Sequence, residues 1–225
     1  MKILAYEIDS LGGCPKWLFP AISVSGSLLH AKLSPAAEIR QKRLLSNRLK
    51  EKVLLCMSIL EIVKYPDKFL RHHTKPVEDI DDSIQKLIDN MAETMYLAPG
   101  VGLAAIQVGI DKSLIIYDIS QKDEKRSLQV IINPRIIETE GNLLSENEGC
   151  LSVPDFTANV KRASSVLVEG FDRHGKPLRM EAEGLAAVVL QHEIDHLAGT
   201  LFIDRISALK RELYKKRFKK KKRKK

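Results

Sequence analysis

Apolar side chains follow a helical spacing in one segment and an extended pattern in the segments after it. In the first, they recur every three to four positions, at Ile80, Ile84, Leu87, Ile88, Met91 and Met95. This spacing predicts an amphipathic helix that packs one face on a core. Four short runs rich in β-branched and aromatic residues follow at residues 114–117, 128–132, 166–171 and 178–182. They predict strands, and a turn-rich link at residues 172–175 favours an antiparallel pairing of the last two.

A second helix is predicted over residues 185–198. It begins after Gly184 and ends at Gly199, a residue suited to the left-handed conformation that stops many helices. Residues 203–217 also have near-helical apolar spacing before the chain becomes purely charged. A helix, several antiparallel strands and a helix together predict the α+β fold class.

Composition limits the kinds of protein to consider. The chain has 225 residues and 44% hydrophobic content, enough for one sizeable core. Its longest unbroken apolar run, residues 185–190, is far below the roughly 20 residues that span a bilayer, so no transmembrane helix is expected. Three widely separated cysteines, Cys14, Cys56 and Cys150, favour a reducing compartment over a disulfide framework.

The positive charge is concentrated at the C-terminus. The whole chain carries +8, yet residues 205–225 hold 13 Lys and Arg against the single acidic Glu212. Residues 208–225 are therefore predicted to be a basic helix or tail, either a solvated segment or one that binds nucleic acid phosphates. Residues 1–56 show no clear series of elements and are interpreted as an N-terminal extension, arising from a misassigned start or an organellar transit peptide.

The predicted second helix contains His192-Glu193-Ile194-Asp195-His196. Two histidines four positions apart project from one helical face, so their imidazoles can share one metal ion. Glu193 stands where its carboxylate can reach a bound water and act as general base. A surface helix that merely carries two histidines is the alternative.

A catalytic zinc-like site needs three protein ligands, and Cys150 is the leading third candidate. The residue six positions after His196 is Phe202, which excludes the metzincin pattern, and no glutamate suits the thermolysin pattern downstream. Cys150 lies between a glycine and an expected turn, and a metal would hold it as thiolate. The alternative is a small buried apolar residue. Gly100 and Gly102 precede Gln107 in a loop that can approach a ligand closely, or in a tight connection after the first helix.

Three motifs together resemble the signatures of the peptide deformylase family: G-V-G-L-A-A-I-Q at residues 100–107, E-G-C-L-S at 148–152 and H-E-I-D-H at 192–196. The resemblance spans residues 57–207, which are taken as the catalytic domain, and residues 57–62 are similar to the usual start of bacterial members. It implies antiparallel sheets packed around a central metal-binding helix. It also implies an enzyme that removes the N-formyl group from the starting methionine of nascent polypeptides and releases formate.

The resemblance assigns roles to particular residues. Cys150, His192 and His196 would bind one divalent metal ion, and Glu193 would serve as general base and acid. The side-chain amide of Gln107 and the backbone N–H of Leu151 would stabilise the oxyanion that forms at the formyl carbon. Gly100 and Gly102 would contact the substrate. Glu148 and Arg162 match positions that pair in some relatives, although exposure to solvent is an equal alternative, and Val189 is a candidate for lining a methionine pocket.

The family also implies a cofactor, partners and a location. Fe2+ is the expected ion, with Zn2+, Ni2+ and Co2+ as alternatives. The substrates would be N-formyl-Met nascent peptides, and the basic tail would bind ribosomal RNA near the exit of the large subunit. A cytoplasmic monomer is expected, or an organellar one if residues 1–56 are a transit peptide. Two other functions remain as hypotheses: a metalloprotease, and a non-catalytic ribosome- or RNA-binding protein with a structural metal.

Overall fold

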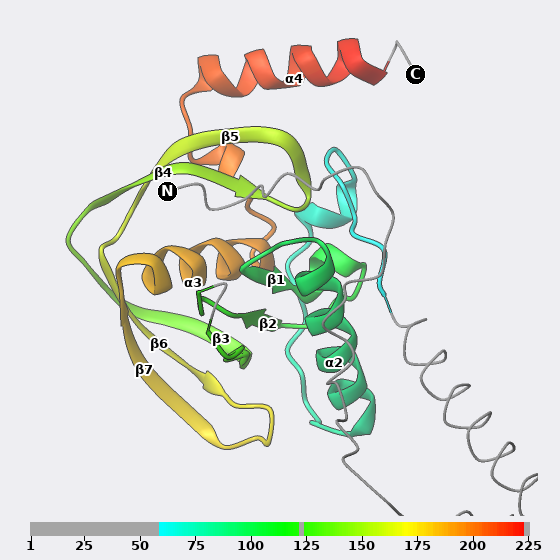
Figure 1. Ribbon diagram of the computed structural model, residues 1–225, viewed down its shortest axis with the longest axis vertical. Helices are drawn as coiled ribbons and strands as arrows, with labels where there is room; N and C mark the ends of the chain where they lie inside the picture. Colours follow the sequence, from blue (N-terminus) through cyan, green and yellow to red (C-terminus); the bar gives the residue numbers. More distant parts are fainter. Residues whose placement is uncertain (1–58, 122–123, 223–225) are drawn as a thin grey trace, which may run out of the picture. The chain divides into compact units, whose positions relative to one another are not determined.

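A computed structural model describes residues 59–121 and 124–222 of the protein (Figure 1). The predicted N-terminal extension, residues 1–56, lies outside the described residues. The predicted limits of the catalytic domain and the basic tail stay predictions. Among the described residues, no helix is both long enough and apolar enough to cross a membrane.

The main sheet has five antiparallel strands in the order β1-β2-β3-β6-β7. They are β1 (Gly102–Ala104), β2 (Leu114–Tyr117), β3 (Gln129–Glu140), β6 (Ser165–Phe171) and β7 (Pro177–Glu183). The four predicted runs match β2, the start of β3 except for Leu128, β6 and β7, so these strands are confirmed. The turn between β6 and β7 contains Gly175, whose φ of 79° suits glycine.

A separate hairpin pairs β4 (Leu143–Cys150) with β5 (Val153–Arg162). Cys150 is the last residue of β4 and stands opposite Val153, so the chain reverses through Leu151 and Ser152 alone. No pattern in the sequence predicted this hairpin. A turn was expected after Cys150, and it is present.

Helix α2 (Asp82–Leu97) begins where the Asp81 side chain accepts a hydrogen bond from the Ile84 N–H at 3.0 Å. Its apolar face packs with residues of β1 and β2 in one core cluster, as the periodicity predicted. Helix α3 (Gly184–Leu197) ends before Gly199, whose φ is 67°. Both predicted helices are thus confirmed.

Helix α3 is the central element of the fold. Most of its residues are buried, and it contacts β1, β2 and β7 of the main sheet. Figure 1 shows α3 between the main sheet and the β4–β5 hairpin. The α+β fold with antiparallel sheets around a central helix is therefore confirmed. Short 3-10 turns η2 (Lys68–Arg71) and η3 (Ala105–Val108) complete the connections.

The C-terminal region differs from the continuous helix predicted over residues 203–217. A 3-10 turn η4 (Phe202–Asp204) comes first, and helix α4 begins only at Ala208 and runs to Lys222. The reason is that Phe202 and Ile206 are buried in a core cluster with Cys150, Val153 and Val160 of the hairpin. This packing fixes the segment against the hairpin before the helix starts. Tyr214 of α4 packs on Phe156 with ring centroids 4.5 Å apart.

Candidate active site

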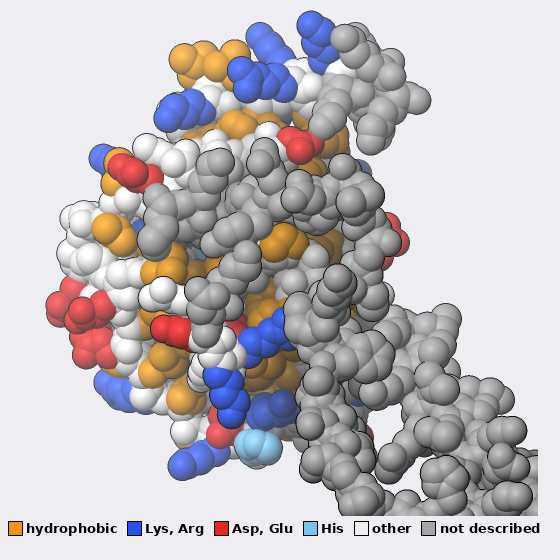
Figure 2. Space-filling view, viewed as in Figure 1, with side chains coloured by type: hydrophobic (Ala, Val, Ile, Leu, Met, Phe, Trp, Pro, Cys, Tyr) orange, Lys and Arg blue, Asp and Glu red, His pale blue; other side chains and the backbone are white. Residues whose placement is uncertain are grey.

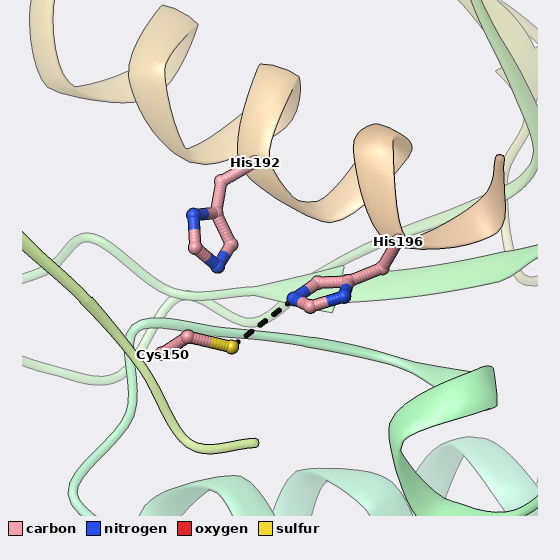
Figure 3. A group of neighbouring side chains, drawn as sticks. All are labelled: Cys150, His192 and His196. Atoms are coloured by element: carbon pink, nitrogen blue, oxygen red, sulfur yellow. Dashed lines mark hydrogen bonds between the residues drawn. The ribbon is translucent and has the colours of Figure 1, made fainter. Parts of the chain in front are cut away.

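Two buried histidines project from α3 towards the hairpin. His192 and His196 lie one helical turn apart, and their ring centroids are 5.0 Å from each other. Their spacing in the sequence therefore places both rings on the same side of the helix, as Figure 3 shows.

Cys150 approaches the same point from the end of β4. Its Sγ lies 3.2 Å from Nε2 of His196 (Figure 3). One donor atom each from Cys150, His192 and His196 fall within 4.8 Å of one another. A tight two-residue turn follows Cys150, and its thiol faces α3.

These donors fit a divalent metal ion. Ligand atoms at about 2.0–2.3 Å from a tetrahedral ion lie roughly 3–4 Å apart, close to the separation of Cys150 Sγ and His196 Nε2. His192 is oriented as a ligand usually is, because its Nδ1 contacts Glu148 Oε1 at 2.7 Å and leaves Nε2 for an ion. The cluster could therefore hold a metal ion.

Glu148 is held in place by a buried ion pair with Arg162. The Arg162 Nη2 donates to Glu148 Oε1 at 2.6 Å, and its Nε donates to Oε2 at 3.2 Å. Both side chains are only 1% exposed, which decides against the solvated alternative. Burial alone would raise the pKa of Glu148, but the hydrogen bonds and charges of His192 and Arg162 lower it to about 2. Glu148 therefore stays ionised beside His192.

Glu193 has a different environment. Burial raises the pKa of its carboxyl to about 7, which suits a group that accepts and returns a proton near neutral pH. Its Oε2 atom is buried and has no hydrogen-bond partner among the described residues. A free buried oxygen is unusual unless a ligand or water completes the site.

The loop that contains Gly100 and Gly102, called the glycine loop below, lies directly against Glu193. A Cβ built on Gly102 would stand 2.8 Å from the Glu193 Cδ, so only glycine leaves room for this carboxylate. At Gly100 the corresponding neighbour is the Leu151 Cδ1, also at 2.8 Å. Neither glycine has a positive φ, and Gly102 is the first residue of β1.

The side-chain amide of Gln107 faces Cys150. Its Nε2 lies 3.5 Å from the Cys150 Sγ and donates to Ser152 Oγ at 3.2 Å, while its Oε1 accepts from the Ala104 N–H at 2.8 Å. The amide is therefore held at both ends with its N–H group directed into the site.

Most of these residues line one pocket. The predicted residues on its wall are Gly102, Gln107, Cys150, Leu151, Val189, His192 and Glu193. Gly100 and His196 do not line the pocket, although each contacts a residue that does. The structure thus brings the predicted site residues into one region.

Other site residues were missed from the sequence. Val101 and Val188 line the pocket, and Ser152 supports Gln107. Asp195 lies inside the His192–His196 motif and accepts a hydrogen bond from Arg162 at 2.6 Å. Its position within a motif of metal ligands was the signal that could have indicated a supporting role.

Comparisons with known proteins agree with this geometry. The family described as polypeptide deformylase matches residues 59–212. A peptide deformylase of Thermodesulfovibrio yellowstonii is 57% identical over 166 residues, which cover 74% of this chain and all of that protein. One of Desulfosudis oleivorans is 55% identical over 73% of this chain and 95% of its own length.

A solved structure supports the same grouping. The crystal structure of a peptide deformylase from Legionella pneumophila is 47% identical, with a TM-score of 0.68 over 73% of this chain and 96% of that one. The matching region contains the candidate metal ligands, the glycine loop and the Gln107 segment. The chain belongs to the peptide deformylase family.

Proposed function

We propose that the protein uses Cys150, His192, His196 and Glu193 to remove the formyl group from the N-terminal formyl-methionine of nascent polypeptides, with release of formate. The convergence of one sulfur and two imidazole nitrogens within 4.8 Å, beside a buried free carboxylate oxygen, carries this proposal. By family the chain is a peptide deformylase, and we propose the roles of these four residues in its reaction.

Different residues of the chain have different roles in the hydrolysis. A divalent ion bound by Cys150, His192 and His196 would lower the pKa of water and polarise the formyl carbonyl. Glu193, with a pKa near 7, accepts the proton of the attacking water and transfers it to the leaving amine. The Gln107 amide N–H and the Leu151 backbone N–H donate hydrogen bonds to the developing oxyanion.

The pocket wall fits the methionine end of such a substrate. Val101, Val188, Val189 and Leu151 supply apolar side chains beside the polar donors. Gly100 and Gly102 leave the backbone open to close approach by the peptide. We propose that the methionine side chain binds against the valines and that the formyl group faces Cys150.

The proposal is tested by formate release from a formyl-methionyl peptide. Protein purified without oxygen should release formate and contain about one metal ion per chain, and a chelator should abolish both. We propose Fe2+ as the ion, with Zn2+, Ni2+ and Co2+ as alternatives, because a Cys/His/His donor set accepts all four. Cleavage of internal peptide bonds without formate release would instead indicate a metalloprotease.

The variant Glu193→Ala separates proton transfer from metal binding. We expect normal metal content with turnover nearly abolished, because Glu193 carries the proton and does not coordinate the ion. Cys150→Ala is the matched comparison and should lose the metal itself. Loss of metal in Glu193→Ala would contradict the assigned role.

A second proposal concerns the basic helix. Figure 2 shows Lys and Arg side chains on the surface of α4, where Leu209 and Leu213 are also 72% and 50% exposed. We propose that α4 binds ribosomal RNA near the exit of the large subunit, through phosphate contacts. Among the side chains of α4 that the structure describes, the exposed cations Lys210, Lys216, Arg217 and Lys220 are available for this.

Ribosome binding should weaken steeply with salt if this proposal holds. Replacement of those four exposed cations by Gln should lower ribosome affinity and flatten the salt dependence, with formate release unchanged. Tyr214, which packs α4 on the hairpin, stays in place in this variant. Equal affinity and salt dependence in both proteins would rule out the RNA contact.

The remaining assignments concern the chain as a whole. We propose that residues 57–207 form the catalytic domain, that residues 208–225 form the basic segment, and that residues 1–56 are an extension. We also propose a monomer in the cytoplasm. Light scattering of the purified chain tests the monomer, and fractionation of cells tests the location.

A further inference from the structure

A series of alternating charges connects His192 to Arg205, which lies outside the pocket. Glu148 contacts the His192 ring and both of its oxygens accept from Arg162. The Arg162 Nη1 donates to Asp195 Oδ2 at 2.6 Å. Arg205 completes the series with two further hydrogen bonds to Asp195, from Nε to Oδ2 and from Nη2 to Oδ1.

The charges in this series are balanced only when Arg205 is present. Two carboxylates, Glu148 and Asp195, match two guanidinium groups. The Glu148 and Arg162 side chains are 1% exposed and Asp195 is 12% exposed, whereas Arg205 is 45% exposed. Without Arg205, the two buried carboxylates would share one guanidinium, and a buried charge that loses its partner is costly. Asp195 would then compete with Glu148 for Arg162.

We propose that Arg205 is a positioning residue for the metal site. By neutralising Asp195, it leaves Arg162 to hold Glu148, and Glu148 orients the ring of His192. This inference rests on the proposed function, because it takes His192 as a metal ligand. Arg205 lies between η4 and α4, so the connection to the basic helix also supports the metal site.

The expected effect can be estimated from outer-shell partners in other metal sites. Removal of such partners typically changes metal affinity or activity by about 10–100-fold. Arg205 acts through Asp195, Arg162 and Glu148, and solvent can replace part of its charge. We therefore expect the low end of this range, about tenfold.

The experiment compares zinc-loaded full-length wild type with Arg205→Ala and Arg205→Lys. The rate of zinc loss to excess chelator and the solvent exchange of the His192 Nδ1–H proton, followed by NMR, are measured. Arg205→Ala should lose zinc about tenfold faster and exchange this proton faster, in line with weakened outer-shell support. Arg205→Lys should fall in between, because lysine keeps the charge and lacks the planar fork.

Arg71→Ala is the matched control. Arg71 binds Asp204 and the Gly199 carbonyl, so its loss loosens the same segment without touching Asp195. We expect zinc loss close to the wild-type rate. Equal rates of zinc loss in wild type and Arg205→Ala would overturn the role of Arg205, and so would equally increased rates in both alanine variants. Either result would leave the proposed function intact. A wild-type chain that binds no zinc or other divalent ion would overturn the proposed function and this inference with it.

Discussion

The close contact between Gly102 and Glu193 allows the position of the proposed general base to be tested by adding one methyl group. In Gly102→Ala, the new Cβ would lie 2.8 Å from Cδ and 2.9 Å from Cγ of Glu193. Gly102 has no positive φ, so alanine fits the backbone of β1. The contact with Glu193 is therefore the main effect of the substitution.

The size of the effect follows from these distances. Carbon atoms in contact prefer a separation of about 3.5–4.0 Å, so the Glu193 side chain must move by nearly ~1 Å. Glu193 is only 4% exposed, so its side chain has little space to move. A misplacement of about 1 Å can cost about 10²-fold in rate, and overpacking costs about 1–3 kcal/mol of stability. We expect kcat to fall about 10²-fold with the metal retained.

The assay measures kcat and KM for formate release, together with metal content and melting temperature. Gly100→Ala provides the contrast, because its Cβ would meet Leu151 Cδ1, the mobile end of a half-buried side chain that can rotate away. Its loss of kcat should be much smaller. A metal-loaded Gly102→Ala enzyme with kcat close to wild type would refute the claim that Glu193 depends on the bare glycine.

Three further predictions follow from the same geometry. Gln107→Ala should lower kcat by about 10²–10³ and keep the metal, because one oxyanion donor is lost; retained full activity would reject that role. Glu148→Ala should lower the free energy of unfolding by about 3–5 kcal/mol, since Arg162 loses a buried partner, and should weaken metal binding; an unchanged melting temperature would contradict it. Removal of the metal by a chelator should lower the melting temperature, because at a free metal concentration of 100 Kd an ion bound only by the folded state stabilises it by about 2.7 kcal/mol; equal melting with and without chelator would argue against a folded-state site.

Helices α2 and α3 could be predicted because their signals are local. Periodic apolar positions define α2, and Gly184 and Gly199 border α3. The β4–β5 hairpin could not be predicted in this way. Asn147 has a φ of 54°, and the pairing shifts register on either side of Glu148, which breaks the alternation of apolar and polar positions. Strand β1 has three buried residues and so shows no alternation at all.

The candidate site was also predictable only where the signal in the sequence is local. His192 and His196 could be paired from sequence because four positions along a helix fix their geometry. The approach of Cys150 depends on how the hairpin packs on α3, and spacing alone left it open between a ligand and a buried apolar residue. The sequence also left open whether Glu148 pairs with Arg162 or faces solvent. The burial of both side chains decides for the pair.

Contacts of Gln191 and Asp195 join the hairpin segment to α3. Each of these residues directly precedes one of the two histidines. Gln191 accepts a hydrogen bond from the Ala163 N–H at 2.9 Å and donates one to the Ala163 carbonyl at 3.0 Å. One turn later, Asp195 binds Arg162, the last residue of β5. Arg162 pairs with Leu143 at the end of the hairpin opposite Cys150, but its side chain also binds Glu148, two residues before Cys150, and so links α3 to the end that carries the thiol. The separation of the three donors is therefore set partly by residues that never touch the ion.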